Sequence, residues 1–164
     1  MRDNTLIIKK AVEYTPPPIQ TIMALDFGVV KMGVALGNTL TQTARPLCQF
    51  AMDNGKPNWD KLIALIQEWQ ATQIIVGLPL NMDGTSSELS LRCHKFARRL
   101  NQQLKDHKIA CPVTLVDERL TSREAKQLAW EYGLISHDSQ PIDSIAAAIL
   151  LGSWLRGMHG ETLL

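Results

Sequence analysis

Short apolar runs that stop at a glycine or an acidic residue recur along this chain and constrain its fold more than any other feature. They lie at residues 22–25, 33–37, 74–76 and 113–116. Runs of this length and composition are typical of strands buried on both faces of a sheet. Because only a short stretch containing a glycine separates the first two runs, the sequence predicts a hairpin there.

Helical patterns alternate with the later apolar runs. Apolar residues at helical spacing predict helices over residues 59–70 and 87–107, and a last helix over 143–154. Residues 121–124 fit a capping box that would open one more helix, and Gly133 suits the end of that helix. A hairpin followed by strands that alternate with helices predicts an α/β fold, with a mixed central sheet flanked by helices.

The length of 164 residues suits one domain, which we place at residues 21–164. Three consecutive prolines at residues 16–18 favour an extended chain, so residues 1–20 are interpreted as an N-terminal arm or linker. The sequence lacks an apolar run of about 18 residues and a signal-peptide pattern, which favours a cytoplasmic protein without a membrane partner. Its three cysteines share no disulfide-like or metal-like spacing and are expected to be reduced thiols. A net charge of +1 does not by itself decide for or against nucleic-acid binding.

Three acidic residues stand out by their positions. Asp26 and Glu118 follow predicted strands, and Asp143 lies where the last helix is expected to begin. In open α/β folds, functional groups gather beyond the carboxyl ends of parallel strands. Carboxylates gathered there are costly to ionise together unless cations join them, and two Mg²⁺ or Mn²⁺ ions held by such oxygens can activate a water for phosphodiester cleavage. The alternative is structural, because acids at strand ends also form turns and cap helices.

Four ordered sequence blocks resemble the YqgF family of Holliday-junction-resolvase-like proteins, which are regarded as nucleases of the small-subunit ribosomal RNA precursor. The blocks are ALDFGVVKMGVALG at 24–37, IIVGLPLNMDGTSSE at 74–88, VDERLTSREA at 116–125 and DSIAAAIL at 143–150. The resemblance implies a ribonuclease H-like fold, with Asp26, Glu118 and Asp143 as the catalytic, metal-binding acids. One departure lies in the first block, where Val29 and Val30 replace the threonine and the basic residue that are usual in the family.

Basic and polar residues near these blocks are candidates for nucleic-acid contacts. Glycines punctuate residues 77–85, which suit either a phosphate-contacting loop or a tight turn that needs glycine. The alternative for each basic residue is a solvated surface charge. The candidates for nucleic-acid binding are Lys31, Arg45, Asn81, Gly84, Thr85, Arg119 and Arg123.

The function predicted from these features is metal-dependent phosphodiester hydrolysis, in 5′-end maturation of the small-subunit ribosomal RNA precursor. Resolution of branched DNA by the same site is the alternative substrate, and a noncatalytic nucleic-acid-binding regulator with the same fold is the alternative function. A phosphotransferase of the actin and sugar-kinase type is disfavoured, since the chain has room for one domain and lacks a second glycine-rich phosphate loop. The ribosome is a candidate partner, and both a monomer and a homodimer are open.

Overall fold

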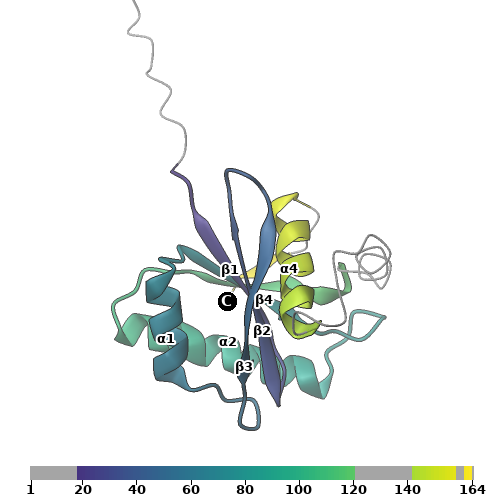
Figure 1. The fold of residues 1–164 in the computed structure, drawn as a ribbon. Coiled ribbons are helices and arrows are strands. Elements are labelled where there is room, and N and C mark those ends of the chain that lie inside the picture. The colour runs from purple at the N-terminus through teal and green to yellow at the C-terminus, as the bar shows by residue number, and fades with distance from the viewer. Residues whose placement is uncertain (1–17, 121–141, 158–160, 164) are drawn as a thin grey trace, which may run out of the picture.

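One mixed sheet forms the centre of the computed structural model, which describes residues 18–120, 142–157 and 161–163 (Figure 1). Within these residues the strand order is β3-β2-β1-β4-β5-β6. Strands β1, β4 and β5 are parallel to one another, whereas β2, β3 and β6 pair antiparallel with their neighbours. The strands are β1 (Thr21–Asp26), β2 (Lys31–Asn38), β3 (Ala44–Ala51), β4 (Gln73–Leu78), β5 (Val113–Asp117) and β6 (Glu161–Leu163).

Helices cover both faces of the sheet. Helices α1 (Trp59–Glu68) and α2 (Glu88–Asp106) lie on one face, and α4 (Ile142–Leu155) lies on the other (Figure 1). The side chains of β1 alternate between these layers, so that Leu25 packs with α1 and α2 while Ala24 packs with α4. The apolar runs are therefore buried on both faces, and the predicted mixed sheet flanked by helices is confirmed.

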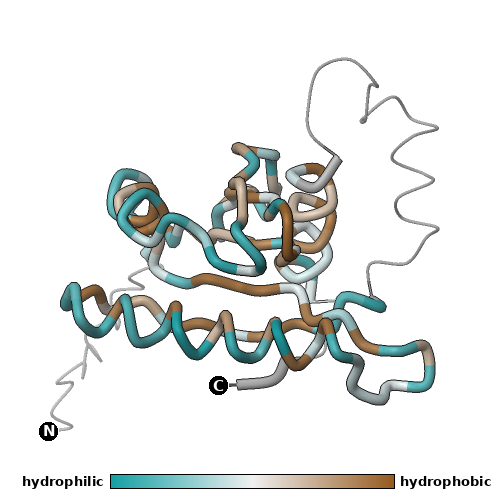
Figure 2. The backbone as a smooth tube through the Cα atoms, turned by 90° about the horizontal axis from the view of Figure 1, so that it is seen from below, coloured by the Kyte–Doolittle hydropathy of each residue, from teal (hydrophilic) through white to brown (hydrophobic). Residues whose placement is uncertain are grey.

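The local sequence explains where α1 and α2 begin. The Asn58 side chain accepts a hydrogen bond from the Lys61 amide, and Ser87 forms a capping box with Ser90. Along α2 the apolar positions recur at helical spacing, which Figure 2 shows as alternating brown and teal segments. Its buried side chains, which include Phe96 and Leu100, fill the layer between helix and sheet.

Helix α4 runs between the two edges of the sheet that are formed by the ends of the strands. Leu150 approaches Gly77 near the carboxyl end of β4, whereas Leu155 approaches Gly37 near the end of β2. Since β2 is antiparallel to β1, these two glycines lie toward opposite edges. The first turn of α4 therefore lies at the edge where the parallel strands β1, β4 and β5 end.

The structure corrects the sequence-based prediction at two strands. Neither β3 nor β6 was expected. Within the described ranges, strand β3 pairs only with β2, and it contains Pro46, which is tolerated on such an outer strand. The helix expected after residue 121, the arm at residues 1–17 and Gly133 lie outside the described residues.

Two further expectations concern the cysteines and the membrane. Cys48, Cys93 and Cys111 are free thiols, as predicted. None of the helices within the described ranges combines the length and apolarity that crossing a membrane takes.

Candidate active site

Asp26 and Glu118 lie on the same face of the sheet, at the edge where the parallel strands end. Asp26 is the last residue of β1, two positions after Ala24, and therefore falls on the face that α4 covers. Glu118 follows β5 directly, and its carboxyl carbon is 3.8 Å from the point that a Cβ atom on Gly77 would occupy. Gly77 belongs to β4, which runs between β1 and β5. The missing side chain of Gly77 leaves space between the two acids.

A buried thiol beneath this edge is affected by both acids. Cys93 of α2 is buried and donates a hydrogen bond to the Gly77 carbonyl oxygen, with Sγ and O 3.3 Å apart. Burial, together with the negative charges of Glu118 and Asp26, raises the pKa of the Cys93 thiol to about 12. The placement of Asp26 and Glu118 at the ends of the two parallel strands that flank β4 is what brings these two predicted site residues to one edge.

The backbone of Asp143 lies toward the same edge, because Asp143 is in the first turn of α4. It is the second residue of α4, seven positions before Leu150, which contacts the Gly77 region. Residues seven apart share one side of a helix, so the Asp143 backbone lies on the side of Leu150, roughly 10 Å nearer the edge. Its side chain lies outside the described residues. Among the side chains that are described, no three potential ligands gather into a metal site.

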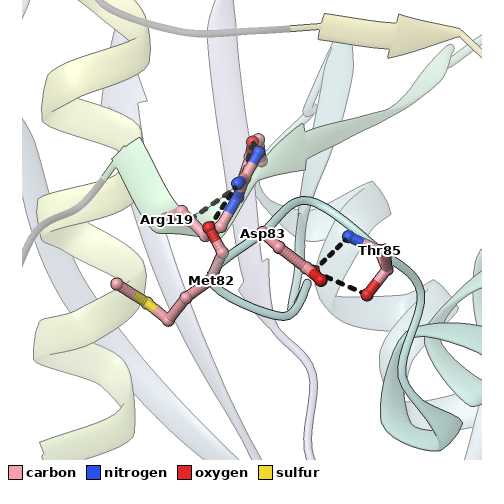
Figure 3. Close-up of polar contacts among 5 residues, drawn as sticks. Met82, Asp83, Thr85 and Arg119 are labelled. Atoms are coloured by element: carbon pink, nitrogen blue, oxygen red, sulfur yellow. Dashed lines mark hydrogen bonds and ion pairs between the residues drawn. The ribbon is translucent and has the colours of Figure 1, made fainter.

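Residues 80–86 form a tight turn that follows β4 at this edge, and they include Asn81, Gly84 and Thr85. Leu80 and Ser86 pair as an isolated bridge, and the Asn81 amide nitrogen donates to the Thr85 carbonyl oxygen. The Asp83 carboxylate accepts from both the backbone amide and the hydroxyl of Thr85 (Figure 3), and these hydrogen bonds lower the pKa of Asp83. Gly84 has a φ of +87°, so the turn uses glycine for its backbone conformation. The tip residue Met82 is 91% exposed.

Arg119 connects this turn to the end of β5. Its guanidinium group donates to the Asp117 carboxylate, with a shortest distance of 2.7 Å from Nη2 to Oδ2, and its Nη1 donates to the Met82 carbonyl oxygen at 3.2 Å (Figure 3). These hydrogen bonds lower the pKa of Asp117 and raise that of Arg119. The Asp117 charge compensates that of Arg119, which sequence analysis had considered as a phosphate contact.

Lys31 also lies at this edge. It begins β2 directly after the turn that follows Asp26, and its side chain is exposed. Val30 beside it is 70% exposed, so one of the two residues that depart from the family pattern faces solvent at the candidate site.

The remaining two predicted contacts are not brought to this edge by the described structure. Arg123 lies outside the described residues. Arg45 lies at the start of β3, where it pairs with Leu36 of β2. Leu36 is five residues beyond Lys31, so Arg45 lies roughly 17 Å from Lys31 along the strand direction. Its guanidinium lies over the Trp69 ring, 5.0 Å from the centroid, beside a cavity of about 230 Å³. The antiparallel strand β3, which was not expected, begins at the opposite edge, so Arg45 lies away from the acids, and its contact with nucleic acid stays a prediction.

We therefore expect Arg45→Ala to leave cleavage of a short substrate unchanged within about twofold, since no contact at the edge that holds Asp26 and Glu118 is lost. Single-turnover rates of the variant and the unaltered protein on the same short oligonucleotide would check this. A drop of tenfold or more with normal thermal stability would contradict the placement of Arg45 away from the reacting phosphate.

The sequence did not predict two structural features of this edge. The gap at Gly77 is a tertiary feature, because a glycine that ends a strand cannot be distinguished in sequence from one that begins a turn. The pairing of Asp117 with Arg119 could have been found, since an acid and an arginine two residues apart at a strand end are within reach of each other.

Comparison with known proteins places these observations in context. A family model described as RuvX, Holliday junction resolvase, matches residues 20–157. A Psychrobacter sp. (strain PRwf-1) protein named "Putative pre-16S rRNA nuclease" is 53% identical over 149 residues, which cover 89% of this chain and 84% of that protein. A protein of the same name from Psychrobacter cryohalolentis is 48% identical over 164 residues, covering 98% and 95% of the two chains.

Solved structures share the fold. The structure of Thermus thermophilus RuvC superposes with a TM-score of 0.56 at 12% identity, covering 87% of this chain and 100% of RuvC. The same protein in complex with a Holliday junction substrate gives a TM-score of 0.55. At this level of identity the likeness concerns the fold alone, which is ribonuclease H-like.

Proposed function

This chain belongs to the RuvX family of Holliday junction resolvases, and from that premise we propose that it is a nuclease that hydrolyses phosphodiester bonds with a divalent metal ion held by Asp26, Glu118 and Asp143. The family resemblance inferred from the four sequence blocks is confirmed by the family match and by the relatives. The observation that carries the proposal is the placement of Asp26 and Glu118 on one face of the sheet, across the gap at Gly77.

The donor set fits Mg²⁺ or Mn²⁺. Carboxylate oxygens are the ligands that these hard cations prefer, and two acids held at one sheet edge repel each other unless a cation lies between them. A metal ion bound there would supply charge neutralisation and an acidified water. Any side chain at position 77 would narrow the space that such an ion needs, since an added Cβ would already lie 3.0 Å from Leu150.

The protein's own residues orient the substrate in this proposal. Lys31 begins β2 beside the acids and supplies a positive charge for a substrate phosphate. The turn at residues 80–86 flanks the other side, where Asn81 and Thr85 serve mainly to hold the turn through their mutual hydrogen bonds. Rigid strand ends and a tightly bonded turn keep the reacting groups in place, which is the protein's principal contribution to phosphoryl transfer.

For the substrate we propose the small-subunit ribosomal RNA precursor, cleaved in maturation of its 5′ end. The names of the relatives at 53% and 48% identity support this choice, and such a substrate implies work in the cytoplasm, with the ribosome as a candidate partner. Branched DNA is the alternative, supported by the description of the family. We retain residues 21–164 as the nuclease domain and residues 1–20 as an arm outside it.

The test compares the protein with Asp143→Asn on a ribosomal precursor fragment, unstructured RNA and a four-way DNA junction, each with Mn²⁺, Mg²⁺ or chelator. We expect cleavage of the precursor fragment that requires both the metal and Asp143. Preferred cutting of the junction would replace the RNA substrate with branched DNA. Metal-independent cutting, or equal rates for the variant, would overturn the proposed mechanism.

A further inference from the structure

The Arg119 guanidinium is occupied within the chain. Its Nε donates to both Asp117 carboxylate oxygens at 3.1 Å, its Nη2 donates to Oδ2 at 2.7 Å, and its Nη1 donates to the Met82 carbonyl oxygen at 3.2 Å. All three guanidinium nitrogens therefore have acceptors in the described structure. Only 34% of the arginine side chain and 20% of the Asp117 side chain are exposed. These contacts use three of the five guanidinium N–H groups, and the adjacent Asp117 carboxylate compensates the positive charge that a phosphate would otherwise meet.

The turn at residues 80–86 is shaped to receive this group. A Cβ atom on Gly84 would lie 3.4 Å from Nη1 and 3.5 Å from Nη2, so the guanidinium packs against the bare backbone of the turn. The other hydrogen bonds described within the turn are internal, among Asn81, Asp83, Gly84, Thr85 and Ser86. Of the contacts described here, Arg119 supplies the hydrogen bond that ties the tip of the turn to the strand end carrying Glu118.

From this geometry we infer that Arg119 and Asp117 act together as a positioning pair, which fixes the turn at residues 80–86 beside Glu118 so that the turn guides the substrate strand toward the acids. The inference rests on the proposed nuclease function for the identity of the substrate. Asp117 orients the guanidinium, and the guanidinium holds the Met82 carbonyl. The highly exposed tip at Met82 is thereby presented to the substrate in one place instead of many.

A positioning pair and a phosphate-binding arginine respond in opposite ways when Asp117 is changed. In a positioning pair, Asp117→Asn weakens the orientation of Arg119 and behaves like Arg119→Ala. The double variant is then no worse than either single variant, because all three lose the same unit. If Arg119 instead bound a substrate phosphate, Asp117→Asn would free the positive charge of Arg119 and strengthen nucleic-acid binding.

The experiment measures three quantities on Asp117→Asn, Arg119→Ala, the double variant and Arg119→Lys. They are hydrogen exchange of the peptide covering residues 80–87, the single-turnover cleavage rate, and RNA affinity as a function of salt. Arg99→Ala is the matched control, because it removes one positive charge from an exposed position of α2. Circular dichroism and thermal melting establish that each variant is folded.

We expect exchange in residues 80–87 to accelerate at least about tenfold in Asp117→Asn, Arg119→Ala and the double variant, with cleavage slowed by a similar factor and affinity changed less than about threefold. Arg119→Lys should lie between, since a lysine cannot form the bidentate pair. Arg99→Ala should leave exchange and cleavage unchanged.

Unchanged exchange in Arg119→Ala would overturn the inference. So would tighter RNA binding by Asp117→Asn together with a salt slope reduced by about one in Arg119→Ala, the signature of a phosphate contact. The exchange measurement needs no catalysis. If the unaltered protein cleaves nothing while the turn still loosens in Arg119→Ala and Asp117→Asn, the nuclease proposal fails and the pair that fixes the turn stands.

Discussion

Asp26→Asn is expected to lower metal-dependent cleavage by a factor of about 10³ or more while leaving the protein folded. The substitution keeps the size of the side chain but removes the negative charge at the end of β1, on the face shared with Glu118. An amide oxygen binds a divalent cation much less strongly than a carboxylate, so both metal affinity and water activation are lost.

The same variant should melt differently from the unaltered protein. Without metal, Asp26→Asn removes repulsion between two acids at one edge and should therefore be at least as stable as the unaltered chain. With Mn²⁺ at about 100 times its dissociation constant, the unaltered protein should gain about 2.7 kcal/mol of stability. For a chain of this size that corresponds to a rise in melting temperature of roughly 5–11 °C. Asp26→Asn should gain little.

Asp106→Asn is the matched control, because it removes one carboxylate from an exposed position, the last residue of α2. It should retain full cleavage and the full thermal shift with Mn²⁺. An Asp26→Asn protein that still cleaves and is still stabilised by Mn²⁺ would remove Asp26 from the mechanism and return it to a structural role at the end of a strand.

The gathering of Asp26 and Glu118 at one edge was predictable because it depends on strand direction. Asp26 and Glu118 each follow a buried apolar run, and parallel strands that alternate with helices bring their carboxyl ends to one edge. No side-chain detail enters that argument, so two separate positions in the sequence could be placed together. The metal-binding roles of these acids stay predictions until cleavage and metal binding are measured.

The features that sequence did not predict depend on tertiary contacts. Strand β3 was overlooked because Pro46 interrupts it and its pairing with β2 shifts register between Val34 and Ala35. Without β3, the sequence could not indicate at which edge of the sheet Arg45 lies. Arg119 was predicted as a phosphate contact because its charge is visible in the sequence, whereas its hydrogen bond to the Met82 carbonyl spans 37 residues and is visible only in the fold.

The turn that follows Asp26 leads to the second large effect. Gly28 lies in this turn between β1 and β2, and a Cβ atom added there would come within 2.2 Å of the Lys31 carbonyl oxygen. The clashing atom belongs to the backbone of a paired strand, so it cannot rotate away as a flexible side chain would. Gly28→Ala must therefore displace the turn itself, together with the strand end that carries Asp26.

We expect Gly28→Ala to lower the free energy of unfolding by about 2–4 kcal/mol, the upper range for overpacking against a rigid neighbour. In thermal melting this corresponds to a loss of roughly 5–15 °C. Cleavage should also fall in whatever fraction stays folded, because the displaced turn moves Asp26 relative to Glu118.

Gly152→Ala in α4 provides the matched control. The three atoms nearest to a Cβ atom there all belong to the Arg156 guanidinium, with Nη1 at 3.3 Å, and the end of an arginine side chain can move aside. Because alanine favours a helix interior by up to about 1 kcal/mol over glycine, Gly152→Ala should melt at the same temperature or higher. If both variants melted alike, the close approach of Gly28 to Lys31 would not be what restricts this position to glycine, and the turn beside Asp26 would be more adaptable than its geometry implies.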